Sequence, residues 1–335
     1  MVRFGIIGTN RITESFIDAA RELNDFKLSA IYSRKQETAT DFAAKYDVEH
    51  TYTDLNEFAK SEHTDAVYIA SPNSLHSSQA ITCMQHGKHV ICEKPFASTS
   101  KEVEQMIDVA RRNDVVLMEA MKSTVLPNFI TIKENLHKIG KVRRYCASYC
   151  QYSSRYDKYK EGIVLNAFKP EFSNGALMDI GIYTIYPMVA LFGKPKFLHA
   201  SSYMLSTGVD GQGSIMFTFD EMEATVNYSK IADSFLPTEI QGEAGSMIID
   251  KIHTPENVRI LYRNGSEEVL TVSQLSKSMY YEAKEFIDLI NSGKKESSLN
   301  SHNNSLQTIK LIEEARRITG IVYPADLTNN ERDRH

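Results

Sequence analysis

The feature that most constrains the fold is an alternation of short apolar runs with helical segments over the first 120 residues. The apolar runs are VRFGIIG (2–8), FKLSAIYS (26–33), DAVYIAS (65–71), KHVICE (88–93) and VVLMEA (115–120). Between them apolar residues recur at helical spacing, as Phe16 and Ala20 do, and Thr99 with Glu102 forms a capping box ahead of a helix at 101–113. Strands that are apolar on both faces and separated by helices predict a parallel, doubly wound sheet. A weaker strand is expected near the sequence EHTYT.

After residue 120 the pattern becomes that of an antiparallel or mixed sheet. Long segments such as 142–152 alternate polar and apolar residues, and glycine turns separate further strands. Residues 153–173 show no periodicity and are expected to form a loop, and a helix is expected at 175–193. We therefore expect two domains: an α/β domain over 1–120, and an α+β domain with an open, mostly antiparallel sheet over 121–335.

Composition and length exclude several classes of protein. The net charge is −5, so no basic surface field favours nucleic acid as a partner. No apolar stretch reaches the ~18 residues that a membrane-spanning helix needs, and the N-terminus runs straight into a strand with no signal peptide. Four cysteines in 335 residues argue against a disulfide scaffold, and no group of cysteines and histidines has metal-ligand spacing. We therefore expect a cytoplasmic protein with no membrane segment and no metal.

The segment GIIGTNRIT lies where the first strand turns into a helix. In dinucleotide-binding folds this turn holds pyrophosphate on backbone N–H groups, with the pattern G-x-G-x-x-G or G-x-G-x-x-A. Aligned on Gly8, the chain has Asn10 and Thr13 at the second and third positions. Asparagine tolerates positive φ, so the turn can still form. We expect a phosphate site formed by Gly8, Thr9, Asn10, Arg11 and Ile12. The alternative is a plain turn from strand to helix.

The second strand ends in Ser33, Arg34 and Lys35. In dinucleotide folds an acidic residue at this point binds the ribose hydroxyls of NAD, whereas an arginine suits the 2′-phosphate of NADP. No acid is present here, and a guanidinium binds phosphate through two parallel hydrogen bonds. We therefore expect NADP(H) as the preferred cofactor and NAD(H) as the second choice. The alternative is a solvated basic turn.

Two further strand ends carry polar residues: Ser71, Pro72 and Asn73 after one strand, and Glu93, Lys94 and Pro95 after the next. In a doubly wound sheet, ligands bind outside the carboxyl ends of the strands. Because proline keeps the preceding residue extended, Lys94 is directed outward and can lie against a nicotinamide. Taken alone, Glu-Lys-Pro also suits a solvated strand end, since charged side chains are rarely buried without a partner.

In this order and at this spacing, GIIGTNRIT, DAVYIASPNSLH, GKHVICEKPFA and GALMDIGIY resemble the Gfo/Idh/MocA oxidoreductases, nearest the branch of dimeric dihydrodiol dehydrogenase and glucose–fructose oxidoreductase. The resemblance covers essentially the whole chain. It implies an N-terminal Rossmann domain that binds the dinucleotide. It also implies a C-terminal domain that binds substrate and whose open sheet forms the interface of a homodimer or homotetramer. The implied substrate is a sugar, a polyol or a cyclic diol.

The resemblance also implies the catalytic residues. The family's catalytic lysine corresponds to Lys94, with Glu93 before it, and His76 lies near the cofactor by the same analogy. The family's second motif, often G-G-G-x-L-x-D-x-G-x-H, ends here in Asp179 and Tyr183, with Tyr183 at the position of the usual histidine. These two residues are four apart and would share a helix face. Without the resemblance they would be interpreted as a capping acid and a core aromatic.

Oxidising an alcohol requires removal of the hydroxyl proton as hydride leaves the carbon. Lysine and tyrosine both titrate near ~10, so the pKa of one must be lowered for it to act as a base near neutrality. We expect Lys94 and Tyr183 to bind and protonate the substrate oxygen, with Asp179 orienting them. The sequence leaves open which of the two transfers the proton.

Three functions compete at this point. The leading hypothesis is an NADP(H)-dependent dehydrogenase or reductase. A second is a catalytically silent dinucleotide-binding regulator on the same scaffold, which the altered glycine motif favours and the presence of Lys94, Asp179 and Tyr183 disfavours. A zinc-dependent alcohol dehydrogenase is disfavoured by the lack of a ligand cluster.

Overall fold

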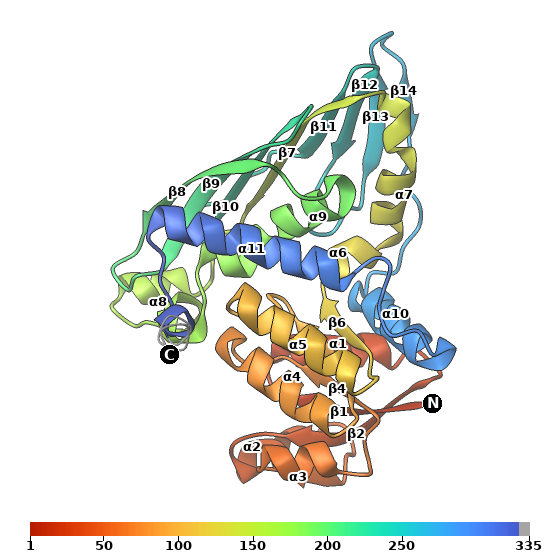
Figure 1. Cartoon of the computed structure of the whole chain (residues 1–335), viewed down its shortest axis with the longest axis vertical. Helices are drawn as coiled ribbons and strands as arrows, with labels where there is room; N and C mark the ends of the chain where they lie inside the picture. Colours follow the sequence, from red (N-terminus) through yellow and green to blue (C-terminus); the bar gives the residue numbers. More distant parts are fainter. Residues whose placement is uncertain (328–335) are drawn as a thin grey trace. The chain divides into compact units, whose positions relative to one another are not determined.

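The computed structural model describes residues 1–327 and divides into two compact units (Figure 1). The first unit joins Met1–Met121 with Leu275–Ser305, and the second joins Lys122–Gln274 with the residues from Leu306 onward. This differs from the division expected from the sequence, which assigned all of 121–335 to the second domain. The last part of that range, residues 328–335, lies outside the described residues.

A six-stranded sheet forms the centre of the first unit. Its strands are β1 (Val2–Ile7), β2 (Phe26–Tyr32), β3 (His50–Tyr52), β4 (Ala66–Ile69), β5 (His89–Glu93) and β6 (Leu117–Ala120). Their order in the sheet is β3-β2-β1-β4-β5-β6, and every neighbouring pair is parallel. The expected parallel sheet is confirmed, as is the weak strand β3. The order reverses direction at β1, and this is the switch point at which a doubly wound fold binds ligands.

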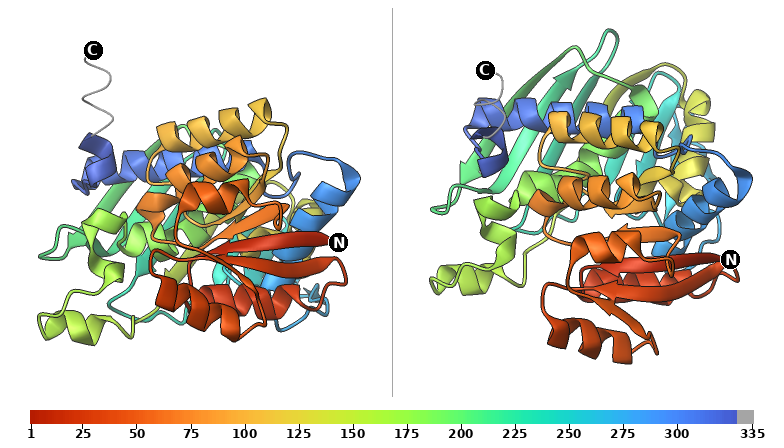
Figure 2. Two further views of the ribbon diagram at one scale, coloured as in Figure 1. Left: turned by 90° about the horizontal axis from the view of Figure 1, so that it is seen from below. Right: turned by 60° about the horizontal axis from the view of Figure 1, so that its bottom comes forward.

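Helices connect successive strands of this sheet. They are α1 (Arg11–Ala20), α2 (Gln36–Ala44), α3 (Leu55–Lys60), α4 (His76–Gln85), which a short 3-10 turn η1 (Asn73–Leu75) precedes, and α5 (Ser100–Arg112). The α3 helix was not expected from the sequence. The capping box of Thr99 and Glu102 is confirmed at the start of α5. In both figures of the whole chain, α4 and α5 lie side by side (Figures 1 and 2).

The core of the first unit explains why a C-terminal segment belongs to it. Phe16 of α1 stacks on Tyr68 of β4, with ring centroids 3.8 Å apart, and both side chains are buried. The helix α10 (Met279–Ser292) packs against α1, and its Phe286 meets Phe4 of β1 edge-on at 5.9 Å. Burial of such aromatic surface is the main stabilising contribution in a core of this kind. The segment around α10 therefore completes the first unit.

The second unit is built on an eight-stranded sheet. Its strands are β7 (Val142–Cys150), β8 (Phe197–Met204), β9 (Asp210–Thr218), β10 (Glu223–Ser229), β11 (Thr238–Gly242), β12 (Gly245–Ile249), β13 (Val258–Tyr262) and β14 (Glu267–Val269). They lie in the order β14-β13-β12-β11-β7-β10-β9-β8. Among the described strand pairs of this second sheet only β7–β10 is parallel, so the expected mixed, mostly antiparallel sheet is confirmed.

Helical segments of the second unit pack on this sheet. They are α6 (Lys122–Val125), α7 (Pro127–Asn135), η2 (Leu136–Ile139), α8 (Tyr156–Lys160), η3 (Asn166–Phe168), η4 (Pro170–Phe172), the π-helical turn η5 (Leu177–Gly181) and α9 (Ile182–Phe192). The helix α11 (His302–Thr319) begins in the first unit and continues in the second. The expected loop at 153–173 thus contains three short helical turns, and η5 with α9 packs on β7 and β10.

The expectation that no apolar stretch is long enough to span a membrane is wrong, because one helical stretch is long and apolar enough by length and composition. It is Pro170–Phe192, with a mean hydropathy of 1.5, and it is the only such stretch among residues 1–327. However, 72% of the 18-residue apolar segment within this stretch is buried inside the fold. This is the pattern of a core helix, which is apolar because other parts of the protein surround it.

Candidate functional site

The turn from β1 to α1 brings two strand ends close together. Gly8 has a φ of +103°, and a Cβ at this position would lie 2.5 Å from the carbonyl oxygen of Ala70. Only glycine fits, because both the conformation and the close approach exclude a side chain. Thr13 is fully buried, and its hydroxyl donates to the Gly8 carbonyl at 2.9 Å. The branched side chain at the third motif position is therefore accommodated by a hydrogen bond.

Asn10 does not adopt the positive φ expected from the sequence; its φ is −105°. It is instead the N-cap of α1. Its side-chain oxygen accepts from the backbone N–H groups of Ile12 at 3.1 Å and Thr13 at 3.3 Å, and its Nδ2 donates to the carbonyl of Ala70 at 2.7 Å. Capping is the usual role of asparagine at this position, and it explains why a glycine is not needed. The N–H of Arg11, at the first helical position, is not among the groups that Asn10 caps.

The end of β2 presents cations to solvent. Arg34 and Lys35 are exposed, and the backbone N–H of Ser33 donates to the carbonyl of Tyr52 at 3.1 Å. Burial raises the pKa of the neighbouring Tyr32, although the charge of Arg34 opposes this. Two exposed cations at a strand end fit a phosphate group. Together with the Gly8 turn, these residues fit the dinucleotide expected from the sequence.

The end of β5 is only partly exposed. Glu93 is 8% exposed, and its carboxylate accepts a hydrogen bond from the hydroxyl of Tyr68 at 2.7 Å. The interpretation of this residue as part of a solvated strand end is therefore wrong. Lys94, which follows, is half-buried, and its peptide bond to Pro95 is cis. The strand end thus presents Lys94 from a backbone held by a buried carboxylate.

His76 lies at the first position of α4 and is fully buried. Its Nδ1 lies 2.9 Å from the carbonyl of Pro95, and its Nε2 lies 2.9 Å from the carbonyl of Ser71. Burial is the main cause that lowers the pKa of His76. The side chain of Ser71 donates to Gln79 of α4 at 2.6 Å. Both ring nitrogens of His76 therefore contact backbone, which favours a positioning role for this residue.

In the second unit, the motif that ends in Asp179 and Tyr183 starts at a capped helix end. The fully buried Asp210 accepts from the N–H of Ala176 at 3.1 Å and from that of Leu177 at 2.7 Å. Burial raises the pKa of Asp210 to about 6. Gly175 has a φ of +138°, and a Cβ there would lie 2.2 Å from Asp210 Oδ1. The glycine of the motif is thus required by the approach of this capping carboxylate.

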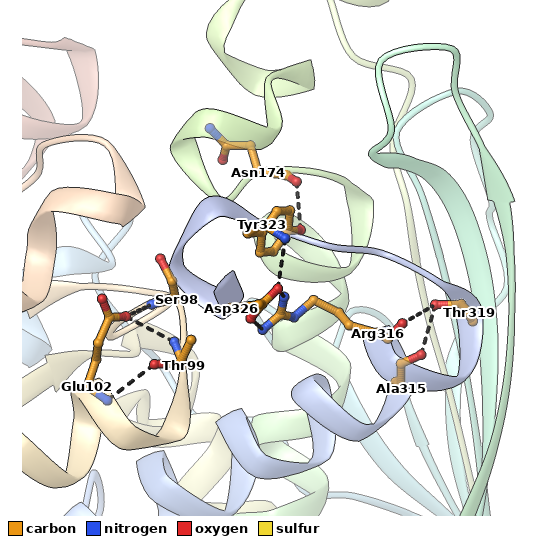
Figure 3. Close-up of polar contacts among 9 residues, drawn as sticks. All are labelled: Ser98, Thr99, Glu102, Asn174, Ala315, Arg316, Thr319, Tyr323 and Asp326. Atoms are coloured by element: carbon orange, nitrogen blue, oxygen red, sulfur yellow. Dashed lines mark hydrogen bonds and ion pairs between the residues drawn. The ribbon is translucent and has the colours of Figure 1, made fainter. Parts of the chain in front are cut away.

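The segment after α11, residues 320–327, also contacts the start of this motif (Figure 3). The hydroxyl of Tyr323 donates to the carbonyl of Asn174 at 2.7 Å. Asp326 accepts from the backbone N–H of Tyr323 and from the guanidinium of Arg316, each at 2.7 Å. Arg316 is buried, whereas the side chain of Asp326 is 24% exposed, so the ion pair is only partly buried.

Asp179, in the π-helical turn η5, forms an ion pair with Lys230. The side chain of Lys230 is 5% exposed, whereas that of Asp179 is 36% exposed. The ammonium also lies 5.4 Å from the ring centroid of Phe168, a cation–π distance. Lys230 was not identified from the sequence. A signal was present, since Lys230 directly follows β10 and continues the alternation of Val226 and Tyr228, which lie on one face of that strand.

Tyr183, in the first turn of α9, belongs to an aromatic cluster with Tyr149 and His253. The rings of Tyr149 and His253 stack at 3.9 Å and are nearly parallel, and Tyr183 meets Tyr149 edge-on at 5.8 Å. Burial, assisted by the charges of Lys122 and Lys251, lowers the pKa of His253 to about 4. The imidazole is therefore neutral at pH 7, and no hydrogen bond within the described residues occupies its buried Nδ1.

The aromatic turn α8 lies on Phe168. Tyr156 and Tyr159 contact its ring at 5.9 and 5.4 Å between centroids, and Tyr159 shares a hydrogen bond with Ser206 at 2.6 Å. Phe168 in turn lies beneath the ammonium of Lys230. Neither Lys230 nor the Tyr149–His253 stack was found from the sequence, because the members of each group come from distant segments.

The comparisons with protein families match both units. The oxidoreductase family with an NAD-binding Rossmann fold matches residues 2–121. The GFO/IDH/MocA C-terminal domain matches residues 131–248.

Individual proteins are similar along nearly the whole chain. A scyllo-inositol 2-dehydrogenase (NADP(+)) of Bacillus subtilis is 57% identical, over 97% of this chain and 99% of that protein. A trans-1,2-dihydrobenzene-1,2-diol dehydrogenase of Danio rerio is 31% identical, over 97% and 99%. Among solved structures, an aldose-aldose oxidoreductase of Caulobacter crescentus complexed with glycerol has a TM-score of 0.84 at 20% identity, over 95% and 97% of the two chains. At this identity the last likeness concerns the fold alone.

Proposed function

Because this chain belongs to the Gfo/Idh/MocA family of oxidoreductases, we propose that it is an NADP(H)-dependent dehydrogenase that interconverts a hydroxyl and a carbonyl on a cyclic polyol. The family membership expected from the sequence is confirmed by both matches. The structural observation that carries the proposal is the pairing of Asp179 with the buried Lys230 ahead of Tyr183, next to the Tyr149–His253 stack. A carboxylate, a phenol and a neutral imidazole are the groups that can bind several hydroxyls of one ring.

The substrate class is chosen from the relatives. The Bacillus subtilis protein that is 57% identical acts on scyllo-inositol with NADP(+), and the Danio rerio protein acts on a cyclic diol. Both substrates carry neighbouring hydroxyls on a six-membered ring. We therefore place a cyclic polyol ahead of an open-chain sugar.

Lys94 and Tyr183 have the proton-handling role in this proposal. One of them removes the hydroxyl proton during oxidation and returns it during reduction, and the other donates a hydrogen bond to the same oxygen. Asp179, held by Lys230, orients Tyr183. When bound, the nicotinamide supplies the hydride acceptor or donor.

The cofactor would be held by the strand ends of the first unit. The residues assigned to it are Gly8, Thr9, Asn10, Arg11, Ile12, Ser33, Arg34, Lys35, Ser71, Pro72, Asn73, Glu93 and Lys94, while His76 supports two of these strand ends through their backbone. Arg34 and Lys35 are the groups for the 2′-phosphate, so we expect tighter binding of NADPH than of NADH.

The test is oxidation of scyllo-inositol with NADP(+), followed by the absorbance of the reduced nicotinamide. Related inositols, glucose and a trans-dihydrodiol serve as the comparison substrates. Lys94→Met should lower kcat at least ~100-fold and leave NADPH binding within about threefold, because the lysine acts on the substrate oxygen. Tyr183→Phe removes only the hydroxyl and should also lower kcat. Binding of NADPH with no turnover of any substrate would favour the silent regulator instead.

We also propose a cytoplasmic homodimer or homotetramer, assembled through the sheet of the second unit. Phe197 and Tyr203 of β8 and Met216 of β9 are exposed by 67, 59 and 45%. They lie on one face of the sheet, since Met216 is paired with His199, between Phe197 and Tyr203 on β8. Native mass spectrometry should show a dimer or tetramer, and Phe197→Glu with Tyr203→Glu should yield a monomer. A wild-type protein that is monomeric at micromolar concentration would contradict this proposal.

A further inference from the structure

Buried side chains of the first unit contact the residues on both sides of Lys94, through the side chain of Glu93 before it and through the backbone after it. Before the lysine, the carboxylate of Glu93 accepts from Tyr68 at 2.7 Å. After it, the carbonyl of Pro95 lies 2.9 Å from His76 Nδ1. The next backbone N–H, that of Phe96, donates to Glu119 Oε1 at 3.0 Å. Two of these groups, His76 and Glu119, thus hold consecutive residues immediately after Lys94.

Both groups are too deeply buried to contact a substrate. His76 is 1% exposed and Glu119 is 2% exposed. They come from different elements: His76 begins α4, and Glu119 lies in β6. His76 Nε2 also lies 2.9 Å from the carbonyl of Ser71, after β4. A neutral imidazole carries one N–H, so it donates to one of the two carbonyls while the ring contacts the other.

Glu119 is itself held in place by the C-terminal segment of the same unit. Asn300 Nδ2 donates to the carbonyl of Glu119 at 3.1 Å and to that of Met121 at 3.0 Å. The side chain of Ser305 hydrogen-bonds to the Glu119 carboxyl. This support explains why a carboxyl group can remain at a fully buried strand position, since a buried acid needs partners.

Charge enters this arrangement as well. The groups that face the Glu119 carboxyl are Ser305, the Phe96 N–H, and the charges of Glu93 and Lys94. Burial raises the pKa of Glu119 to about 7, and the charge of Lys94 acts in the opposite direction. Near neutral pH the carboxyl is therefore divided between its two forms. In either form one oxygen can accept from Phe96, so the hydrogen bond does not depend on the charge.

We propose that Glu119 and His76 are positioning residues that hold Lys94 through the backbone of Phe96 and Pro95. This inference rests on the proposed function, because it gives the two residues a role only if Lys94 acts on the substrate oxygen. A lysine must lie within hydrogen-bond reach of the reacting oxygen, and a shift of about 1 Å can cost on the order of 100-fold in rate.

The test compares two replacements of Glu119 in the full chain. Glu119→Gln keeps an oxygen that accepts from Phe96 and removes the charge, whereas Glu119→Leu removes both. Glu102→Leu is the matched control, because the carboxylate of Glu102 also accepts from backbone N–H groups of the first unit, at Ser98 and Thr99 (Figure 3). Glu119→Leu and Glu102→Leu each lose hydrogen bonds to backbone N–H groups, at different distances along the chain from Lys94.

Three quantities are measured: hydrogen exchange of the peptide 93–97 in the protein without nucleotide, the Kd of NADPH, and kcat with the polyol. Glu119→Leu should speed exchange of the Phe96 amide at least ~10-fold and lower kcat ~10- to 100-fold, with the Kd of NADPH within about threefold. Glu119→Gln should restore exchange and kcat to within about fivefold of the wild type. Glu102→Leu should speed exchange at 98–99 and leave kcat within about twofold. For the second residue, His76→Phe should lower kcat without loss of NADPH binding.

Several results would overturn the inference. Normal exchange and normal kcat in Glu119→Leu would show that Phe96 is held without Glu119. A Glu119→Gln variant with a protected Phe96 amide and the low kcat of Glu119→Leu would assign the effect to charge, not to position. A loss of NADPH binding in proportion to kcat would mean that Glu119 supports the unit as a whole. The proposed function fails separately, by full turnover of Lys94→Met.

Discussion

The ion pair of Asp179 and Lys230 leads to an asymmetric prediction for stability. The lysine side chain is 5% exposed and the aspartate side chain 36%. Asp179→Asn therefore leaves a buried ammonium without its counter-charge, whereas Lys230→Met leaves a carboxylate that water can reach and a side chain that still packs on Phe168. The first change should cost more free energy of unfolding than the second, although both remove the same ion pair.

The magnitude follows from burial. Removing one partner of a fully buried pair costs about 3–5 kcal/mol. Here the asparagine oxygen can still accept from Lys230, and the nearby charge of Asp210 also interacts with this lysine, so we expect about 2–3 kcal/mol for Asp179→Asn. For Lys230→Met we expect less than about 1 kcal/mol, because the remaining carboxylate is partly solvated. The double variant, Asp179→Asn with Lys230→Met, should have about the same free energy of unfolding as Lys230→Met alone.

Urea unfolding at pH 7.5, followed by tyrosine fluorescence and circular dichroism, measures these differences; the chain has no tryptophan. Lys158→Met is the control, since its ion pair with Glu161 is exposed on both sides (53 and 55%) and should contribute less than about 0.5 kcal/mol. Equal destabilisation by Lys230→Met and Asp179→Asn would refute this asymmetry. So would a double variant that is no more stable than Asp179→Asn.

Three further predictions concern the cofactor loop, the end of β2 and the aromatic cluster. Gly8→Ala places a methyl group 2.5 Å from the Ala70 carbonyl and should weaken NADPH binding at least ~10-fold in a fluorescence titration; unchanged affinity would contradict the assignment of this turn. Arg34→Ala should raise the Kd of NADPH ~10- to 100-fold and leave that of NADH within about twofold, so equal losses for both would count against a 2′-phosphate contact. For His253, the unfolded chain takes up a proton near ~6.5 but the folded protein only near a pKa of about 4, so the free energy of unfolding should fall as the pH drops through this range. His253→Gln should reduce that fall by about 1–2 kcal/mol between pH 7 and 5, and parallel stability curves for the two proteins would refute it.

Local patterns were the most informative part of the sequence. The apolar runs predicted the strands of the first unit, and Thr99 with Glu102 predicted a helix start, because both signals depend on neighbours along the chain. The expectation for Asn10 was wrong in its conformation, since its side chain caps α1 from an extended backbone. The motif pattern alone could not distinguish a left-handed turn residue from a cap, because asparagine suits both.

The amino-acid sequence by itself thus determined the parallel sheet of the first unit, the mixed sheet of the second, the family, and the candidates Lys94, Asp179 and Tyr183. Only the tertiary structure decided that Lys230 binds Asp179, that His253 stacks on Tyr149, that Glu119 holds the residue two after Lys94, and that Leu275–Ser305 completes the first unit. The physical reason is that each of these contacts joins segments far apart in the chain. The sequence does not show whether a lysine, a histidine or a glutamate is exposed or buried. Only the packing around the side chain determines its partner and its charge.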